Sequence, residues 1–251
     1  MPKLIFLGTS NAIPDLQHDN THMAVVGETR MALIDCGTNP ILRFKQAGLD
    51  IHDLTDVLLT HFHPDHVAGV PSLLMNMWLL GRKAPLNIYG LAYTLERIEK
   101  MMEFYDWGSW PNFFPTHFHD LPEQELSLAL DSPEFRVISS PVCHMVPAIG
   151  LRIEFLKSGR ILAYSCDTEP CEAVVRLAAQ ADLLVHEATG AGVGHSSAKE
   201  AGEIASQAQA KALALIHYKA GDENPSPLVN EAKESFQGPV FLAQDFMAIE
   251  F

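Results

Sequence analysis

Residues 61–66 concentrate side chains that bind metal ions. The segment reads His-Phe-His-Pro-Asp-His, so three imidazoles and one carboxylate lie within six residues. Imidazole and carboxylate ligands suit zinc, manganese or iron. In a loop, His61 and His63 can converge on one ion while Asp65 and His66 face a second, and two ions about 3.5 to 4 Å apart can share a water. The spacing indicates a dinuclear metal site; the alternative is a polar loop that holds three histidines by chance.

Residues 116–121 open with Thr-His-Phe-His, the same four residues as 60–63. His117 and His119 are followed by Asp-Leu-Pro instead of Pro-Asp-His, so the Asp-His pair for a second ion is missing. Alternation on a short strand places Phe118 on one face and both histidines on the other. We therefore expect a structural role for this copy; a position at the rim of the substrate site is the alternative.

The metal-binding motif follows an apolar run, residues 56–60, that predicts a strand, so the histidines are expected in a loop at a strand's end. Apolar patterns elsewhere predict strands that alternate with helices, which indicates an α/β protein. The further strands are predicted over residues 3–8, 22–27, 30–37, 86–90, 134–144, 149–156, 160–167, 182–188 and 212–218. The helices are predicted over 67–81, 92–105, 169–180 and 196–210, with another that starts at Asn39-Pro40.

The pattern His-x-His-x-Asp-His resembles the signature of the metallo-β-lactamase superfamily. The resemblance implies an α/β fold, an αββα four-layer sandwich with the metals at one edge between its two sheets. It also implies further ligands, each at the end of a later strand. His144, Asp167 and His217 match the third histidine, the bridging aspartate and the last histidine of the family pattern. Asp35 matches a buried aspartate that orients the metal loop and is not a ligand.

Three other segments narrow the resemblance. Phe-Leu-Gly-Thr-Ser-Asn-Ala-Ile-Pro at 6–14, Leu-Leu-Val-His-Glu-Ala-Thr-Gly at 183–190 and the segment 194–205, which opens Gly-His-Ser-Ser, are similar to segments of ribonuclease Z-type phosphodiesterases. In that group the histidine that matches His195 protonates the leaving oxygen, and the glutamate that matches Glu187 positions it. The resemblance therefore implies a phosphodiesterase.

The resemblance also implies a specific role for each site residue. Two divalent metal ions are expected, zinc first, with manganese or iron as alternatives. Asp65 is expected to accept a proton from the attacking water as well as to bind metal. The first ion is assigned to His61, His63 and His144, the second to Asp65, His66 and His217, and Asp167 is assigned to both.

Two departures from ribonuclease Z bear on the substrate. Ribonuclease Z carries a basic arm between the third histidine and the bridging aspartate, whereas only 22 residues separate His144 from Asp167 here. The loop after residue 9 carries Asp15 and Asp19, and the chain has a formal charge of −14. Acidic surface disfavours a long polyphosphate. We expect a small or cyclic phosphodiester as substrate, with RNA as an alternative partner.

Several other functions remain open. One is tRNA 3′ processing. Another is hydrolysis of a lactone, carboxylic ester or thioester, because a metal hydroxide can attack a carbonyl carbon as well as a phosphorus atom. A non-catalytic metal-binding scaffold is a third. The pair His195 and Glu187 favours a phosphodiester, because a poor alkoxide leaving group needs an acid. The superfamily members that reduce oxygen at a di-iron site have an acidic residue in place of the second histidine of the motif. This chain has His63 there, which disfavours a di-iron redox role.

Composition limits the class of protein further. The 251 residues are 47% hydrophobic, which is compatible with one domain over residues 1–251. No apolar run is long enough to span a membrane and no secretory signal opens the chain, so a cytoplasmic protein without a membrane partner is expected. The four cysteines show no metal or disulfide spacing. Cys143 and Cys166, each beside an expected ligand, are predicted to be buried in a sheet.

Two surface assignments stay open from the sequence. The apolar residues 70–80 can pack against a second copy in a homodimer or against the core. A group of large aromatic residues can contact substrate, a partner or the core. It consists of Trp107, Trp110, Phe113 and Phe114. The remaining histidines, His18, His22 and His52, carry no pattern and are expected at the surface or in turns.

Overall fold

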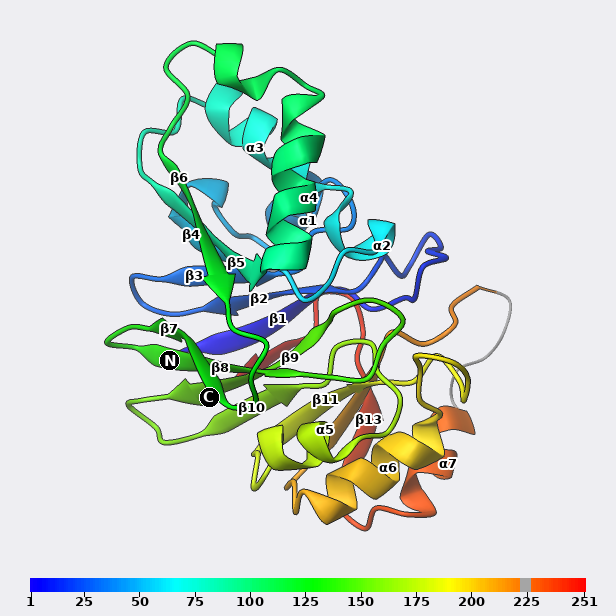
Figure 1. Ribbon diagram of the computed structural model, residues 1–251. Helices are drawn as coiled ribbons and strands as arrows, with labels where there is room; N and C mark the ends of the chain where they lie inside the picture. Colours follow the sequence, from blue (N-terminus) through cyan, green and yellow to red (C-terminus); the bar gives the residue numbers. More distant parts are fainter. Residues whose placement is uncertain (222–226) are drawn as a thin grey trace.

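A computed structural model describes residues 1–221 and 227–251 as two mixed sheets that stack face to face, with helices on both outer sides (Figure 1). The first sheet has the order β14 (Ala248–Glu250), β1 (Lys3–Gly8), β2 (His22–Val26), β3 (Met31–Ile34), β4 (Leu54–Leu58), β5 (Leu86–Leu91) and β6 (Thr116–Leu121). The second has the order β13 (Val240–Leu242), β12 (Leu213–Ile216), β11 (Leu183–Glu187), β10 (Ile161–Tyr164), β9 (Ile149–Phe155), β8 (Phe135–Pro141) and β7 (Ser127–Asp131).

The helices divide between the two outer sides. Above the first sheet in Figure 1 lie α1 (Pro40–Gln46), α3 (Val70–Leu79) and α4 (Ala92–Glu103), and α2 (Pro64–Val67) lies to the right of that sheet. Below the second lie α5 (Glu172–Leu177), α6 (Ala198–Gln207) and α7 (Pro227–Lys233). Two short 3₁₀ turns, Ile51–Asp53 and Trp107–Ser109, complete the described helical segments. The αββα sandwich expected from the motif is confirmed.

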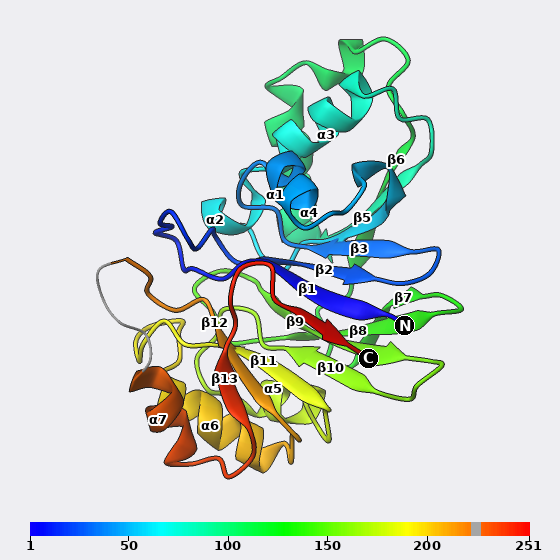
Figure 2. The ribbon, with the colours of Figure 1, turned by 180° about the vertical axis from the view of Figure 1, so that it is seen from behind.

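Three apolar clusters hold the layers together. The central cluster joins the inner faces of the sheets, with Phe6 and Ile34 from the first and Leu151 and Val185 from the second. A second cluster packs α1, α3 and α4 on the first sheet, and a third packs α5, α6 and α7 on the second. Figure 2 shows from behind that the C-terminal strand β14 closes the first sheet beside β1.

Strand direction brings the expected site residues to one edge. Strands β3 to β6 are parallel, as are β10 to β13. Strand β8 is antiparallel to β9, which is antiparallel to β10, so β8 and β10 run the same way. Strands β8, β10 and β12 therefore run the same way, and the loops that follow them leave the second sheet at one edge. The loop that follows β4 leaves the first sheet at the carboxyl end of that strand. In open α/β sheets this edge is where ligands bind.

Three sequence expectations were wrong in detail. The helix predicted over 67–81 is divided into α2 and α3, because Gly69 donates its backbone N–H to Cys36 and a new helix starts at Val70 with Pro71 in its first turn. The helix predicted over 169–180 starts only at Glu172, because Pro170 disfavours helical backbone in the residue before it. His22, expected at the surface, is buried in β2.

The aromatic group packs on the apolar cluster outside the first sheet. Phe114 is buried there, and Trp107, Trp110 and Phe113 are partly buried against it. Trp110 also stacks on Trp78, with ring centroids 4.9 Å apart. These contacts support the core interpretation of the group. Within the two described stretches, no helix has the length and apolar character to cross a membrane.

Candidate metal centre

The loop that carries the first four candidate ligands is folded tightly against the loop after β3. It leaves β4 at Leu58 and continues into the one-turn helix α2. The backbone carbonyl of Asp65 lies so close to Gly37 that a Cβ on Gly37 would be 1.8 Å from it. A side chain at residue 37 would displace α2. The sequence places a glycine there, which allows Asp65 and His66 to reach inward from α2.

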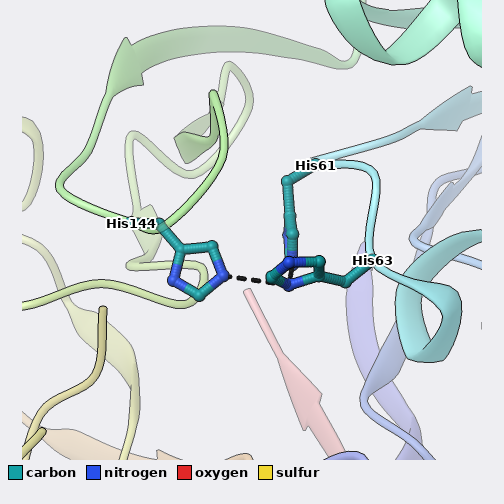
Figure 3. Close-up of side chains that lie close together, drawn as sticks. All are labelled: His61, His63 and His144. Carbon is teal, nitrogen blue, oxygen red and sulfur yellow. Dashed lines mark hydrogen bonds between the residues drawn. The ribbon is translucent and has the colours of Figure 1, made fainter. Parts of the chain in front are cut away.

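Three histidines from the two halves of the sandwich converge (Figure 3). His61 Nε2 and His144 Nε2 each lie 3.1 Å from His63 Nδ1, and one ligand atom from each residue lies within 4.8 Å of the others. Burial lowers the pKa of all three imidazoles, most strongly that of His61. Neutral imidazoles have a free nitrogen lone pair, so the group can bind a cation. We name it the three-histidine group.

A second group, the carboxylate group, consists of Asp65, His66, Asp167 and His217. The Nε2 atoms of His66 and His217 each lie 3.4 Å from Asp65 Oδ2, and they lie 3.5 and 3.4 Å from Asp167 Oδ2. Asp167 Oδ2 is also 4.0 Å from His61 Nε2 in the three-histidine group. One carboxylate oxygen therefore reaches both groups.

Two buried atoms of the carboxylate group have the chemistry of cation ligands. His66 Nε2 and Asp167 Oδ1 are buried and have no hydrogen-bond partner within the described ranges. A buried polar atom without a partner is costly, and such atoms in native structures call for an explanation. Burial opposes ionisation of Asp167, but His217 and His66 hold its pKa well below the ordinary value. Anionic oxygens and unpaired imidazole nitrogens are together the donor set of a divalent transition-metal ion.

Asp35 orients His66 from behind. It is fully buried at the end of β3, and its Oδ2 accepts a 2.9 Å hydrogen bond from His66 Nδ1. The same carboxylate accepts bonds from the backbone N–H and the hydroxyl of Thr60. Because its Nδ1 proton is held by Asp35, His66 directs Nε2 towards Asp65 and Asp167.

Two residues that the sequence reasoning missed orient other imidazoles. Thr189 Oγ1 lies 2.8 Å from His217 Nδ1, and the carbonyl of Gly194 accepts a 2.7 Å bond from His144 Nδ1. Each contact leaves Nε2 free on the side of the candidate ions. Both residues fall within the segments that resemble ribonuclease Z, and this resemblance is the sequence feature that could have identified them. Their partners were not predictable from spacing, because the contacts join loops that follow different strands.

Glu187 and His195 form a hydrogen-bonded pair beside both groups. His195 Nδ1 donates to Glu187 Oε1 at 2.9 Å, and its ring centroid lies 5.2 Å from that of His144 and 5.9 Å from that of His217. The hydrogen bond with Glu187 raises the pKa of His195, although partial burial opposes the shift. His195 therefore keeps its proton to higher pH than an ordinary histidine, as a general acid requires.

The second Thr-His-Phe-His copy lies outside both groups. Phe118 packs on the outer apolar cluster, whereas His117 and His119 are exposed on the other face of β6. His119 stacks on Tyr89 with ring centroids 4.5 Å apart and contacts Asn87. The structural role expected for this copy agrees with these contacts.

The two cysteines beside candidate ligands differ from each other. Cys166 is buried, and its Sγ lies 3.5 Å from His61 Nδ1. Cys143 is exposed, so the prediction that it is buried was wrong. The reason is that β8 ends at Pro141, and the alternation of a strand no longer applies two residues later.

Known proteins resemble the chain along its whole length. Residues 2–238 match the family described as Anti-Pycsar protein Apyc1. Ribonuclease Z of Methanothermobacter thermautotrophicus is 30% identical, in an alignment that covers 100% of this chain and 97% of the relative. Human tRNase Z, short form, is 26% identical with a TM-score of 0.79 and covers 99% of this chain and 98% of its own.

A further solved structure shows the same fold. The metallo-β-lactamase fold protein YhfI from Bacillus subtilis has a TM-score of 0.85 at 22% identity, with 100% of this chain and 99% of that one covered. The two groups described above lie at the sandwich edge of a fold shared with these proteins. The chain belongs to the Anti-Pycsar protein Apyc1 family and is a ribonuclease Z-like, metal-dependent hydrolase of the metallo-β-lactamase fold.

Proposed function

We propose that the protein is a dinuclear metal-dependent phosphodiesterase that acts on a small or cyclic phosphodiester. The observation that carries the proposal is the position of Asp167 Oδ2, 4.0 Å from His61 Nε2 and 3.4 Å from His217 Nε2. A carboxylate that reaches two donor groups suits a bridging ligand between two divalent ions. The raised pKa of His195 beside these groups adds a proton donor for the leaving oxygen.

Zinc is the ion that we propose for both positions, with manganese or iron as alternatives, because imidazole and carboxylate ligands suit all three. Ions bound here supply Lewis acidity that activates water and neutralises charge on the phosphoryl group. The proposed ligands of the first ion are His61, His63 and His144, those of the second are Asp65, His66 and His217, and Asp167 is shared.

The protein's own side chains move the protons. Burial works to raise the pKa of Asp65, but the imidazoles of His217 and His66, each with Nε2 3.4 Å from its Oδ2, outweigh burial and lower that pKa. Asp65 is proposed to accept a proton from the attacking water. His195, held by Glu187, is proposed to donate its proton to the departing alkoxide. An acid at this place favours a phosphodiester with a poor leaving group over a lactone.

Charge and loop contacts support a small substrate. The formal charge is −14, and only 22 residues connect His144 to Asp167, so no long basic arm projects there. The loop after Ser10 is held down by Asp15, which accepts bonds from His18 and Gly221. This loop offers little positive charge to a large polyphosphate. RNA is the second candidate substrate, and the support for it is the name ribonuclease Z of the relatives.

The deciding experiment compares kcat/KM on precursor tRNA with kcat/KM on bis(p-nitrophenyl) phosphate and on cyclic nucleotides. Reactions are run at about 0.15 M salt, where surface charges are screened as in the cell, with zinc and with manganese. We expect efficient cleavage of a small diester and weak, salt-sensitive binding of tRNA. Accurate 3′ cleavage of tRNA at higher efficiency would overturn the preference for a small substrate.

We also propose that two copies of the chain associate through the outer surface of α3 and α4, which includes the carboxyl ends of both helices. Large apolar side chains are exposed there, among them Leu79 at 65%, Phe104 at 90% and Tyr105 at 59%. Exposed large apolar side chains are typical of surfaces that contact another protein. A molar mass of one chain by light scattering, at micromolar concentration, would contradict the homodimer.

A further inference from the structure

Glu169 lies where three site loops meet. Its backbone N–H donates to the carbonyl of Cys143 at 2.8 Å, in the loop that carries His144. Its carboxylate Oε1 accepts a 2.8 Å bond from the N–H of Gly194, in the loop that carries His195. Glu169 itself follows Asp167 by two residues. One residue therefore connects the loops of a proposed ligand, of the shared carboxylate and of the proposed acid.

Gly194 is hydrogen-bonded to both Glu169 and His144. Its carbonyl accepts the Nδ1–H bond of His144, while its N–H is held by Glu169. Its φ angle is +79°, and a Cβ there would lie 2.9 Å from His144 Nδ1. The glycine backbone thus lies directly on the imidazole, and both the close contact and the left-handed conformation favour glycine. A shift of this backbone would move the hydrogen-bond acceptor of His144 and, one residue later, His195.

The loop that carries Gly194 needs an external anchor. Residues 190–193 are exposed, with Val193 exposed to 77%. Two backbone bonds, from Gly190 to Ser196 and from His195 to Gly192, close the loop on itself. These local bonds do not fix its distance from the loop of Asp167. At the base of the loop the Ser196 hydroxyl donates to the Thr168 carbonyl at 2.7 Å. At Gly194 itself, the bond to the Glu169 carboxylate makes the connection.

We propose that Glu169 is a positioning residue that holds Gly194 against His144, and thereby keeps both the three-histidine group and His195 in place. The inference rests on the proposed function, since it takes the roles of His144 and His195 from there. The ordinary alternative is an exposed glutamate that only solvates the surface. That alternative predicts that its removal changes neither metal binding nor the dependence of rate on the leaving group.

The test uses three variants of the full-length protein. Glu169→Ala removes the acceptor for Gly194, and Glu169→Gln keeps a carbonyl oxygen that can still accept that bond. Glu172→Ala is the matched control, because Glu172 is an exposed glutamate of the same segment that pairs with Arg176 at 3.6 Å. Zinc affinity is measured by competition with a chromophoric chelator. Rates are measured on an unactivated diester and on a nitrophenyl diester.

We expect Glu169→Ala to weaken the binding of one zinc ion by about 10- to 100-fold, the usual effect of removing a partner that orients a metal ligand. Its rate loss at saturating zinc should be larger on the unactivated diester, because that leaving group depends on His195. Glu169→Gln should regain most of both properties, and Glu172→Ala should match wild type. In a His144→Ala background, Glu169→Ala should add no further loss of zinc affinity.

Two results would overturn the inference while the proposed function stands. One is a Glu169→Ala protein with the zinc affinity and the leaving-group dependence of wild type. The other is a Glu169→Gln protein as impaired as Glu169→Ala, which would assign the effect to charge instead of to the bond with Gly194. A wild-type protein that binds no zinc and cleaves neither diester would instead remove the proposed function, and this inference with it.

Discussion

Replacing Glu187 by glutamine tests the proposed acid most directly. Glu187 is fully buried at the end of β11, and its carboxylate accepts four N–H bonds. Oε2 accepts from Thr189 N at 2.9 Å, and Oε1 accepts from the other three, which are His195 Nδ1, Thr168 N and Ser196 N. All four partners are donors, so a side-chain amide can satisfy them only partly.

The arrangement of donors decides how glutamine sits. If its oxygen takes the place of Oε1, three bonds remain and only the NH₂ group faces Thr189 N–H. The reverse orientation would set the NH₂ group against three donors. Loss of a bond to a charged acceptor costs about 1.5–3 kcal/mol, so Glu187→Gln should lower the free energy of unfolding by about that amount. His195 keeps its partner, which separates the loss of charge from a loss of position.

The pH dependence follows from the removed charge. His195 acts as an acid only while protonated, and the bond with Glu187 raises its pKa. The rate of the wild-type enzyme on an unactivated diester should therefore hold until pH rises through that raised pKa, and fall above it. Glu187→Gln should move this fall to lower pH. At neutral pH its rate loss should stay below that of His195→Ala, for which a proposed general acid predicts about 10²- to 10⁴-fold.

The assay is kcat/KM against pH at saturating metal, with thermal unfolding followed in parallel. A nitrophenyl diester is the control, because its leaving group departs without a proton and should show little change in the alkaline limb. An alkaline limb at the same pH in Glu187→Gln and wild type would refute the reasoning. So would equal losses of His195→Ala on both substrates, which would make His195 a substrate-binding residue.

Three further perturbations follow from the geometry. His63→Ala should release one metal ion, whereas His119→Ala should retain the wild-type metal content, as measured by elemental analysis; equal losses would contradict the separate roles of the two histidine motifs. Gly37→Ala should lose metal and stability because its Cβ would lie 1.8 Å from the Asp65 carbonyl, while Gly108→Ala, with open space around it, should do neither. A chelator should abolish hydrolysis, and zinc or manganese should restore it; activity that persists without metal would contradict the metal-dependent mechanism.

The sequence predicted the fold class and the motif loop, because the spacing of residues 61–66 is local and falls at the end of a predicted strand. It also named His144, Asp167 and His217, but only through family resemblance, since no local pattern marks them. The orienting residues Asp35 and Glu187 were also named through that resemblance, whereas the orienting contacts of Thr189, Gly194 and Glu169 were not predictable. The bond between Glu169 and Gly194 joins residues that are distant in the chain, and the register of strands β10 and β11 brings them together.

The break between α2 and α3 was missed for a related reason. The apolar pattern over 67–81 is continuous, but Gly69 packs against the backbone of Thr38, where a Cβ would lie 1.8 Å from the carbonyl oxygen. A contact of this kind ends a helix without changing the pattern of apolar residues. Local periodicity reports which face is buried and does not report where a distant loop crosses the helix.

The proposed ligands are divided between the halves of the sandwich, with His61 and His66 from the first and Asp167 and His217 from the second. Neither half can assemble a full set alone, and closing the long loops between residues so far apart in the chain costs conformational entropy, so we expect these contacts to form late in folding. Tight metal capture should therefore follow docking of the two sheets. During refolding, the rate of zinc uptake would then report the rate of docking. Ions bound by ligands from both halves would also slow the separation of the two sheets.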